Sequence, residues 1–188
     1  MLGNLTIQDG KVDIVGSIAY VPQQAWIQNQ TIRQNIIFTS DFDRRKYDKV
    51  IDACSLRTDL DILSGGDQTE IGEKGINLSG GQKQRVALAR AAYQNKDLYL
   101  FDDPLSAVDA HVGKAIFSNL IGPKGMLRKK TRVLVTNNPS VLADVDYIVV
   151  LKDGRIVEEG SYSTLMDSGG VLADLLKDFR QKEDGTED

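Results

Sequence analysis

The sequence predicts an α/β fold, and three observations support this. Apolar segments of strand length occur at 98–101, 133–136 and 147–151, and the strands of a buried parallel sheet are typically short continuous apolar runs. A helical pattern over 107–120 separates the first two segments. The length of 188 residues suits one domain with a sizeable core. Alternation of strands and helices is typical of the α/β class.

Upstream of these segments the chain predicts two more strands. Val12–Val15 and Ser17–Val21 are mostly apolar, and Gly16 separates them. Gln23 follows the second strand almost directly. Pro22 ends that strand, because proline cannot continue a ladder of backbone hydrogen bonds.

The stretch from Thr31 to about Tyr93 predicts helices instead. Its loops, such as 64–67 with two glycines, interrupt the pattern. The apolar positions at roughly helical spacing include Val50, Ile51, Cys54 and Leu56. We interpret this stretch as a mostly helical insertion in the α/β core.

The C-terminal part predicts a hairpin followed by two helices. Asp153-Gly154 between apolar segments is a strong two-residue turn signal, so we expect an antiparallel ribbon that ends the sheet. The last helix has an apolar face of Leu172, Leu175, Leu176 and Phe179. Residues 181–188 are polar and acidic and predict a disordered tail or linker.

These patterns divide the chain into four parts. They are the remainder of the core sheet (1–30), a helical subdomain (31–95), the rest of the α/β core (96–180) and the acidic tail (181–188).

Composition excludes several classes of function. The net charge of −4 disfavours binding to nucleic acid through phosphate contacts. No apolar stretch reaches the 18 to 20 residues, roughly, that a membrane span needs, and no secretory signal precedes the first strand. Cys54 is the only cysteine, so disulfides and cysteine-built metal sites are excluded, and we expect a buried, unreactive thiol in a reducing compartment.

The most informative motif is Leu78-Ser79-Gly80-Gly81-Gln82, directly before a helical run. Ser79 is a good N-cap, and the two glycines let backbone N–H groups approach an anion. The positive end of the helix dipole points to the same place. The pattern suits a phosphate group, although a serine-capped helix after a glycine turn would give the same residues.

Two aspartates mark a second candidate site. Asp102 and Asp103 end the strand 98–101, and the carboxyl ends of strands are where open α/β sheets bind ligands. One carboxylate there can hold Mg²⁺, and the other can orient or deprotonate a water molecule. A pair of turn-forming aspartates before Pro104 is the structural alternative.

Taken together, the motifs resemble ATP-binding-cassette domains, which are P-loop-NTPase-like. Gln23, Leu78–Gln82, Leu98–Asp103 and Ser106–Asp109 occur in the order of that family. Ala19–Asn29 and Thr69–Gly75 are similar to the first nucleotide-binding domain of the multidrug-resistance-associated (ABCC) transporters. The resemblance covers nearly the whole chain.

This resemblance implies a role for each matching position. Gln23 resembles the Q-loop glutamine near Mg²⁺ and the attacking water, and Asp102 the magnesium-binding Walker B aspartate. Asp109 resembles the D-loop aspartate. Ser79, Gly80, Gly81 and Gln82 resemble the signature that contacts the γ-phosphate of ATP bound to a second nucleotide-binding domain, paired head to tail. Trp26 is interpreted as a packing residue, near the surface where such domains receive the transmembrane domains.

Three departures from the family pattern weaken the ATPase interpretation. The sequence contains no Gly-x-x-x-x-Gly-Lys-Ser/Thr, so we expect a domain incomplete at its N-terminus, with Met1 an internal or truncated start. Asp103 occupies the catalytic glutamate position, and Asn137 the position of the switch histidine, whose proton chemistry asparagine lacks. His111, the only histidine, is interpreted as a solvated side chain.

The resulting hypothesis is a nucleotide-binding domain of an ABC exporter that donates its signature to a composite site for ATP and Mg²⁺. We expect a soluble chain at the cytoplasmic face of a membrane, within a full transporter, that does not hydrolyse ATP alone. A non-catalytic interaction module or truncated isoform is the alternative. A DNA-repair ATPase is disfavoured because the interval from Gln23 to Leu78 is too short for a long coiled coil.

Overall fold

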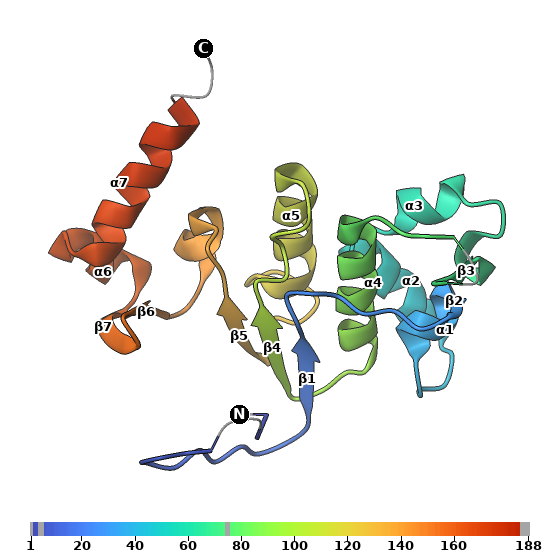
Figure 1. Cartoon of the computed structure of the whole chain (residues 1–188), viewed down its shortest axis with the longest axis horizontal. Coiled ribbons are helices and arrows are strands. Elements are labelled where there is room, and N and C mark those ends of the chain that lie inside the picture. The colour runs from blue at the N-terminus through green and yellow to red at the C-terminus, as the bar shows by residue number, and fades with distance from the viewer. Residues whose placement is uncertain (1, 4–5, 74–75, 185–188) are drawn as a thin grey trace.

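The computed structural model describes residues 2–3, 6–73 and 76–184, and places a small parallel sheet at the centre of the chain (Figure 1). The strand order is β1-β4-β5. The three strands are β1 (Ile18–Val21), β4 (Leu98–Asp102) and β5 (Thr131–Val135). Both pairings are parallel, with Val21 opposite Phe101 and Phe101 opposite Leu134. The predicted α/β class is confirmed.

The described helices between β1 and β4 lie on one side of the sheet (Figure 1). They are α1 (Ile32–Ile37), α2 (Arg44–Ala53), α3 (Arg57–Ile62) and α4 (Gly80–Tyr93), with a 3₁₀ turn η1 (Gly66–Gln68) between α3 and α4. A two-residue antiparallel ladder that the sequence did not predict joins β2 (Gln30–Thr31) to β3 (Glu70–Ile71). The division into four parts by residue number stays a prediction.

The second half of the chain carries the remaining elements. They are α5 (Ala110–Ile116), a π-turn η2 (Phe117–Ile121), a 3₁₀ turn η3 (Pro139–Asp144), β6 (Ile148–Lys152), β7 (Arg155–Gly160), α6 (Tyr162–Ser168) and α7 (Val171–Asp184). Asp153 and Gly154 have φ values of 50° and 74°, as the predicted two-residue hairpin turn requires.

The hairpin does not end the central sheet, as the sequence led us to expect. β6 pairs only with β7, in a separate two-stranded sheet. The connection through η3 carries β6 away from β5, so the edge of β5 gains no partner there (Figure 1).

One further expectation is wrong. Val12–Val15 is not a strand: the described central sheet consists of β1, β4 and β5, and the segment 12–15 pairs with none of them. Val15 is 95% exposed. On α7, Leu172 and Leu176 are buried as expected, whereas Leu175 is 48% exposed and Ala173 is buried instead. The helix also extends to Asp184, into the predicted tail, and 185–188 lie outside the described residues.

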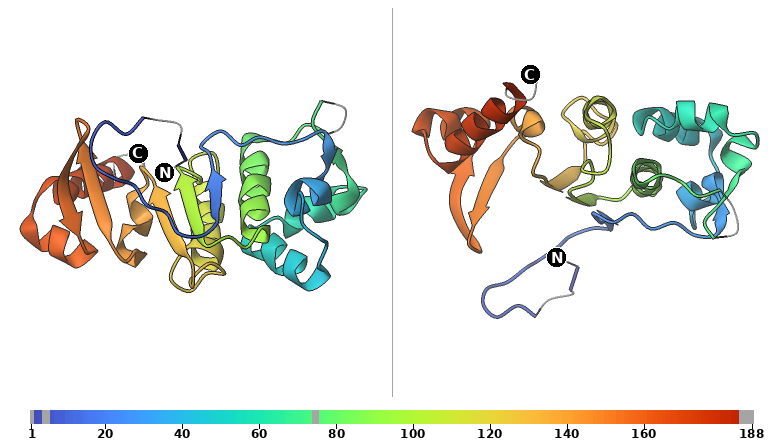
Figure 2. Two further views of the ribbon diagram at one scale, coloured as in Figure 1. Left: turned by 90° about the horizontal axis from the view of Figure 1, so that it is seen from below. Right: turned by 45° about the horizontal axis from the view of Figure 1, so that its top comes forward.

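One continuous core joins the sheet to the helices. Leu88 and Tyr93 of α4 pack with Tyr99 and Phe101 of β4, and all four are fully or almost fully buried. Cys54 belongs to the same core, as predicted. Helices α4 and α5 cover one face of the sheet, whereas the segment before β1 runs along the other (Figure 2).

The face turned toward that N-terminal segment carries an apolar cavity of about 730 Å³. Leu2, Ile7, Val12 and Ile14 line one wall, and Tyr20, Leu100, Asp102, Val133 and Val135 line the sheet side. Within the described part of the chain, no helix is both long and apolar enough to cross a lipid bilayer.

Candidate functional site

Gln23 and Asp103 meet at the carboxyl edge of the parallel sheet. Gln23 Nε2 donates a hydrogen bond of 3.2 Å to Asp103 Oδ2. Asp103 has a φ of 44°, a left-handed conformation that aspartate tolerates better than most residues, and is only 9% exposed. Its N–H donates to the carbonyl of Val135 at 2.8 Å. The backbone therefore holds this carboxylate at the end of β4.

The neighbouring Asp102 is the last residue of β4 and points to the other face of the sheet. Its Oδ2 accepts a hydrogen bond of 3.1 Å from the hydroxyl of Tyr20 on β1. The pKa of Tyr20 is raised above its ordinary value. Desolvation is the larger cause, and the hydrogen bond to Asp102 adds to it. Sequence reasoning missed Tyr20, although it stands between Ala19 and Val21, which are buried, and is thus turned outward by the strand alternation.

The signature turn, which we define as residues 79–82, begins α4 in the way that the sequence predicts. Ser79 is the N-cap, and its Oγ accepts from the N–H of Gln82 at 3.2 Å. Gln82 Oε1 in turn accepts from the Ser79 N–H at 2.9 Å, which completes a capping box. Ser79 and Gly80 are exposed, and the first N–H groups of a helix have no acceptor within the helix itself.

The two glycines of this turn have different surroundings. A Cβ atom on Gly81 would stand 2.9 Å from the carbonyl oxygen of Ala107, whereas one on Gly80 would meet nothing within 4 Å. Gly81 thus lets α4 approach the segment after β4 closely. That segment leads to Asp109, the exposed N-cap of α5, whose side chain accepts from Val112 N at 3.0 Å.

The predicted residues therefore fall into separate groups. Gln23 is bonded to Asp103, Asp102 is bonded to Tyr20 on the other face of the sheet, and the signature turn lies against the segment that leads to Asp109. Between described residues, no hydrogen bond links the signature turn to either aspartate. Asn137 is exposed beyond the end of β5, and His111 is exposed on α5.

Buried polar residues of α4 hold these parts in place, and sequence reasoning missed them. Gln84 is 1% exposed and donates to the carbonyl of Pro22 at 3.3 Å, next to Gln23. Arg90 donates to the backbone oxygens of Asn35 at 2.7 Å and Trp26 at 3.1 Å. Arg90 stands among apolar residues in the sequence of α4, which is a signal, whereas Gln84 lies in a run of polar residues and gives none.

Arg90 also explains the position of Trp26. The guanidinium lies 3.8 Å from the centroid of the indole ring, and Phe38 meets the same ring edge-on at 5.9 Å. Burial lowers the pKa of Arg90 to about 10. Trp26 is 45% exposed, which agrees with the predicted packing role at the surface.

The described residues contain no preformed cluster of metal ligands. In residues 2–3, 6–73 and 76–184, no three His, Cys, Asp or Glu side chains gather closely enough to bind a metal ion. Mg²⁺, however, is usually held by one or two carboxylates together with waters and substrate phosphates. Asp102 fits that use if phosphate oxygens supply further ligands, whereas no hydrogen bond among the described residues joins Gln23 to Asp102.

Comparison with known proteins gives consistent matches. Residues 3–106 match the family described as ABC transporter. The chain is 60% identical over 187 residues to ATP-binding cassette sub-family C member 2 of Mus musculus, covering 100% of this chain and 12% of that protein. It is 53% identical over 186 residues to multidrug resistance protein mrp-7 of Caenorhabditis elegans, covering 99% of this chain and 12% of that protein. The chain therefore spans about an eighth of the length of these relatives.

Proposed function

Because the chain belongs to the ABC transporter family and resembles its sub-family C members, we propose that it is a nucleotide-binding domain that donates its signature turn to ATP held by a second domain. Membership of this family implies binding of ATP and Mg²⁺ in general. The finer proposal concerns which half of the composite site this chain supplies.

The exposed start of α4 is the observation that carries the proposal. The capping box fixes Ser79 and Gln82, and Gly80 between them is exposed, with open space where a side chain would stand. Hydrogen bonds from such groups to a phosphate are charge-assisted, and the helix dipole adds to them. A γ-phosphate placed there by another domain would meet a preformed donor surface.

The groups that would serve a nucleotide bound to this chain itself are weaker. The sequence contains no Gly-x-x-x-x-Gly-Lys-Ser/Thr, whose N–H groups and lysine cradle the β- and γ-phosphates. Asp103 has a shorter reach than a glutamate, and its carboxylate is already bonded to Gln23. Asn137 cannot take up a proton near neutral pH. We therefore propose that this chain alone does not hydrolyse ATP.

Each remaining residue has a proposed part in the composite site. Asp102 and Gln23 would hold Mg²⁺ together with phosphate oxygens. Asp109, on the segment in contact with Gly81, would face the second nucleotide-binding domain. The surface formed by Trp26 and Phe38 would receive a transmembrane domain of an exporter, because two large aromatic rings are partly exposed there.

A release experiment tests this function. A second nucleotide-binding domain of an ABCC transporter with an intact phosphate loop is loaded with a fluorescent ATP analogue, mant-ATP, and Mg²⁺. Hydrogen bonds to charged groups are worth about 1.5–3 kcal/mol each, so the chain should slow mant-ATP release about tenfold or more. Ser79→Arg should abolish the effect by blocking the turn.

Two results would contradict the proposal. One is mant-ATP release that is equally fast with and without the chain, which would favour an interaction module without a part in nucleotide binding. The other is ATP hydrolysis by the chain alone that Asp102→Asn abolishes, which would show a complete catalytic site.

A further inference from the structure

A carboxylate of another helix supports the signature turn from the side of the protein. Asp59 lies on α3, and its Oδ1 accepts hydrogen bonds from Gln82 Nε2 at 2.9 Å and from Arg85 Nη2 at 3.1 Å. Its Oδ2 lies 2.6 Å from Arg85 Nη1 in an ion pair. The side chains of Asp59 and Arg85 are each only 15% exposed. The carboxylate therefore connects α3 to the first turn of α4.

The contact with Asp59 decides which way the amide of Gln82 faces. An amide has one acceptor end and one donor end. Asp59 accepts from the donor end, which leaves Oε1 directed at the N–H of Ser79, where it accepts at 2.9 Å. The reverse orientation would turn two acceptors, Gln82 Oε1 and Asp59 Oδ1, toward each other.

Arg85 links the same carboxylate to the backbone of the turn. Its Nη1 donates to the carbonyl of Ser55 at 2.7 Å, and its Nε approaches the carbonyl of Gly81 at 3.4 Å. One carboxylate thus acts through Gln82 on Ser79 and through Arg85 on Gly81. These two residues flank Gly80, which is exposed.

We propose that Asp59 is a positioning residue of the signature turn, which fixes the direction of its N–H groups for a phosphate held by a second domain. This inference rests on the proposed function and adds a residue that the motif itself does not contain. Asp59 touches no part of the proposed nucleotide. It acts by holding Gln82 and Arg85.

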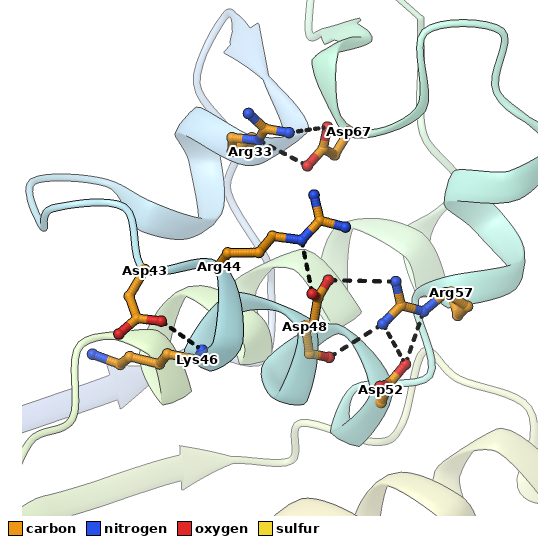
Figure 3. A network of polar contacts seen from close by, with 8 residues as sticks. All are labelled: Arg33, Asp43, Arg44, Lys46, Asp48, Asp52, Arg57 and Asp67. Carbon is orange, nitrogen blue, oxygen red and sulfur yellow. Dashed lines mark hydrogen bonds and ion pairs between the residues drawn. The ribbon is translucent and has the colours of Figure 1, made fainter.

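The same subdomain offers a matched control, an ion pair that does not reach the turn. Asp67 is bonded at both carboxylate oxygens by Arg33, with distances of 2.8 and 2.9 Å (Figure 3). Its side chain is 17% exposed, close to the value for Asp59. Asp67→Asn therefore removes a similar carboxylate from a similar environment.

The experiment compares Asp59→Asn with Asp67→Asn in the full chain. The first measurement is hydrogen exchange of the Ser79 backbone N–H by NMR, and the second is mant-ATP release from the intact second domain. Melting temperatures monitor the fold.

For Asp59→Asn we expect hydrogen exchange of the Ser79 N–H to accelerate about tenfold, because its acceptor, Gln82 Oε1, is no longer held in place. The rate of mant-ATP release should then be within about twofold of the rate measured for the second domain without this chain. Asp67→Asn should leave both measurements unchanged, even where it lowers the melting temperature.

The outcomes separate the two proposals. If the two variants have the same Ser79 exchange and the same mant-ATP release, the role of Asp59 is overturned. If wild-type chain fails to slow release, the proposed function falls and the inference falls with it. If Asp59→Asn does not fold, Gln82→Met takes its place, because it keeps the Asp59–Arg85 pair and removes only the amide. If the Gln82→Met chain slows mant-ATP release as much as the wild-type chain does, the inference is overturned.

Discussion

The α-carbon of Gly81 faces the carbonyl oxygen of Ala107 so closely that a methyl group on it would stand 2.9 Å from that oxygen. The contact joins the first turn of α4 to the segment between β4 and α5. Two parts of the chain that we propose to face the same partner are thus in contact within one molecule. A side chain at this position would have to displace one of the two parts, because real Cβ atoms essentially never come that close to a backbone oxygen.

This contact predicts different effects for the two glycines of the turn. Gly81→Ala should destabilise the chain by about 1–3 kcal/mol, the usual cost of overpacking. Gly80→Ala should be neutral or slightly stabilising, because alanine is the better helix former and space is open there. Urea unfolding of both variants checks this. Equal stabilities for the two would show that the approach of Ala107 is not a constraint.

Arg90→Lys should destabilise the fold by about 2 kcal/mol. The guanidinium serves two backbone carbonyls and the side-chain oxygen of Asn35, and a lysine cannot reach all of them, which leaves a buried acceptor unpaired. Arg45→Lys, an exposed arginine of α2, is the control and should change stability little. The measurement is again urea unfolding, and similar losses in both variants would contradict the prediction.

Asp97 predicts a particular dependence of stability on pH. It accepts hydrogen bonds from the Ser17 N–H at 2.8 Å and from the Ser17 hydroxyl at 2.7 Å. Both bonds lower the pKa of Asp97, and the backbone bond has the larger effect. Because the folded-state pKa is the lower one, the unfolded chain takes up the proton first. The stabilisation is therefore complete above roughly pH 4 and fades as the pH falls through the folded-state pKa.

The test compares the free energy of unfolding of wild type and Asp97→Asn between pH 7 and pH 3. The difference should be largest near neutral pH and should shrink in acid. Ser17→Ala should reduce the difference without removing it, because the backbone donor remains. A difference that stays constant with pH would refute the assignment.

Cys54 should resist modification in the native state. Burial raises the pKa of its thiol, and the side chain is fully buried. Only the thiolate reacts at a useful rate, so a disulfide reagent such as DTNB should label the chain only as it opens. Labelling in native buffer as fast as in urea would contradict this prediction.

Local patterns were sufficient to predict many of these features. The turn at Asp153-Gly154, the cap at Ser79 and the strand before Asp102 depend on residues close together in sequence, and each is present. Turn and cap preferences arise from backbone conformations and hydrogen bonds within a few residues, so one sequence suffices to recognise them.

The missed features depend on contacts between distant residues. Asp59 and Gln82 are 23 positions apart, and Gln84 reaches Pro22 across 62 positions. Nothing local distinguishes these polar side chains from solvated ones. The strand predicted at Val12–Val15 failed for a related reason, since apolar alternation does not show whether a neighbouring strand exists to pair with it.

The register of β1 and β4 has one more consequence. Val21 is paired with Phe101, and both Gln23 and Asp103 come two residues later in their chains. A shift of one residue moves a strand by about 3.3 Å, which is comparable to the length of the Gln23–Asp103 hydrogen bond, and turns its side chains to the other face. Insertions or deletions between β1 and Gln23 should therefore separate these residues, whereas length changes before β1 should be tolerated.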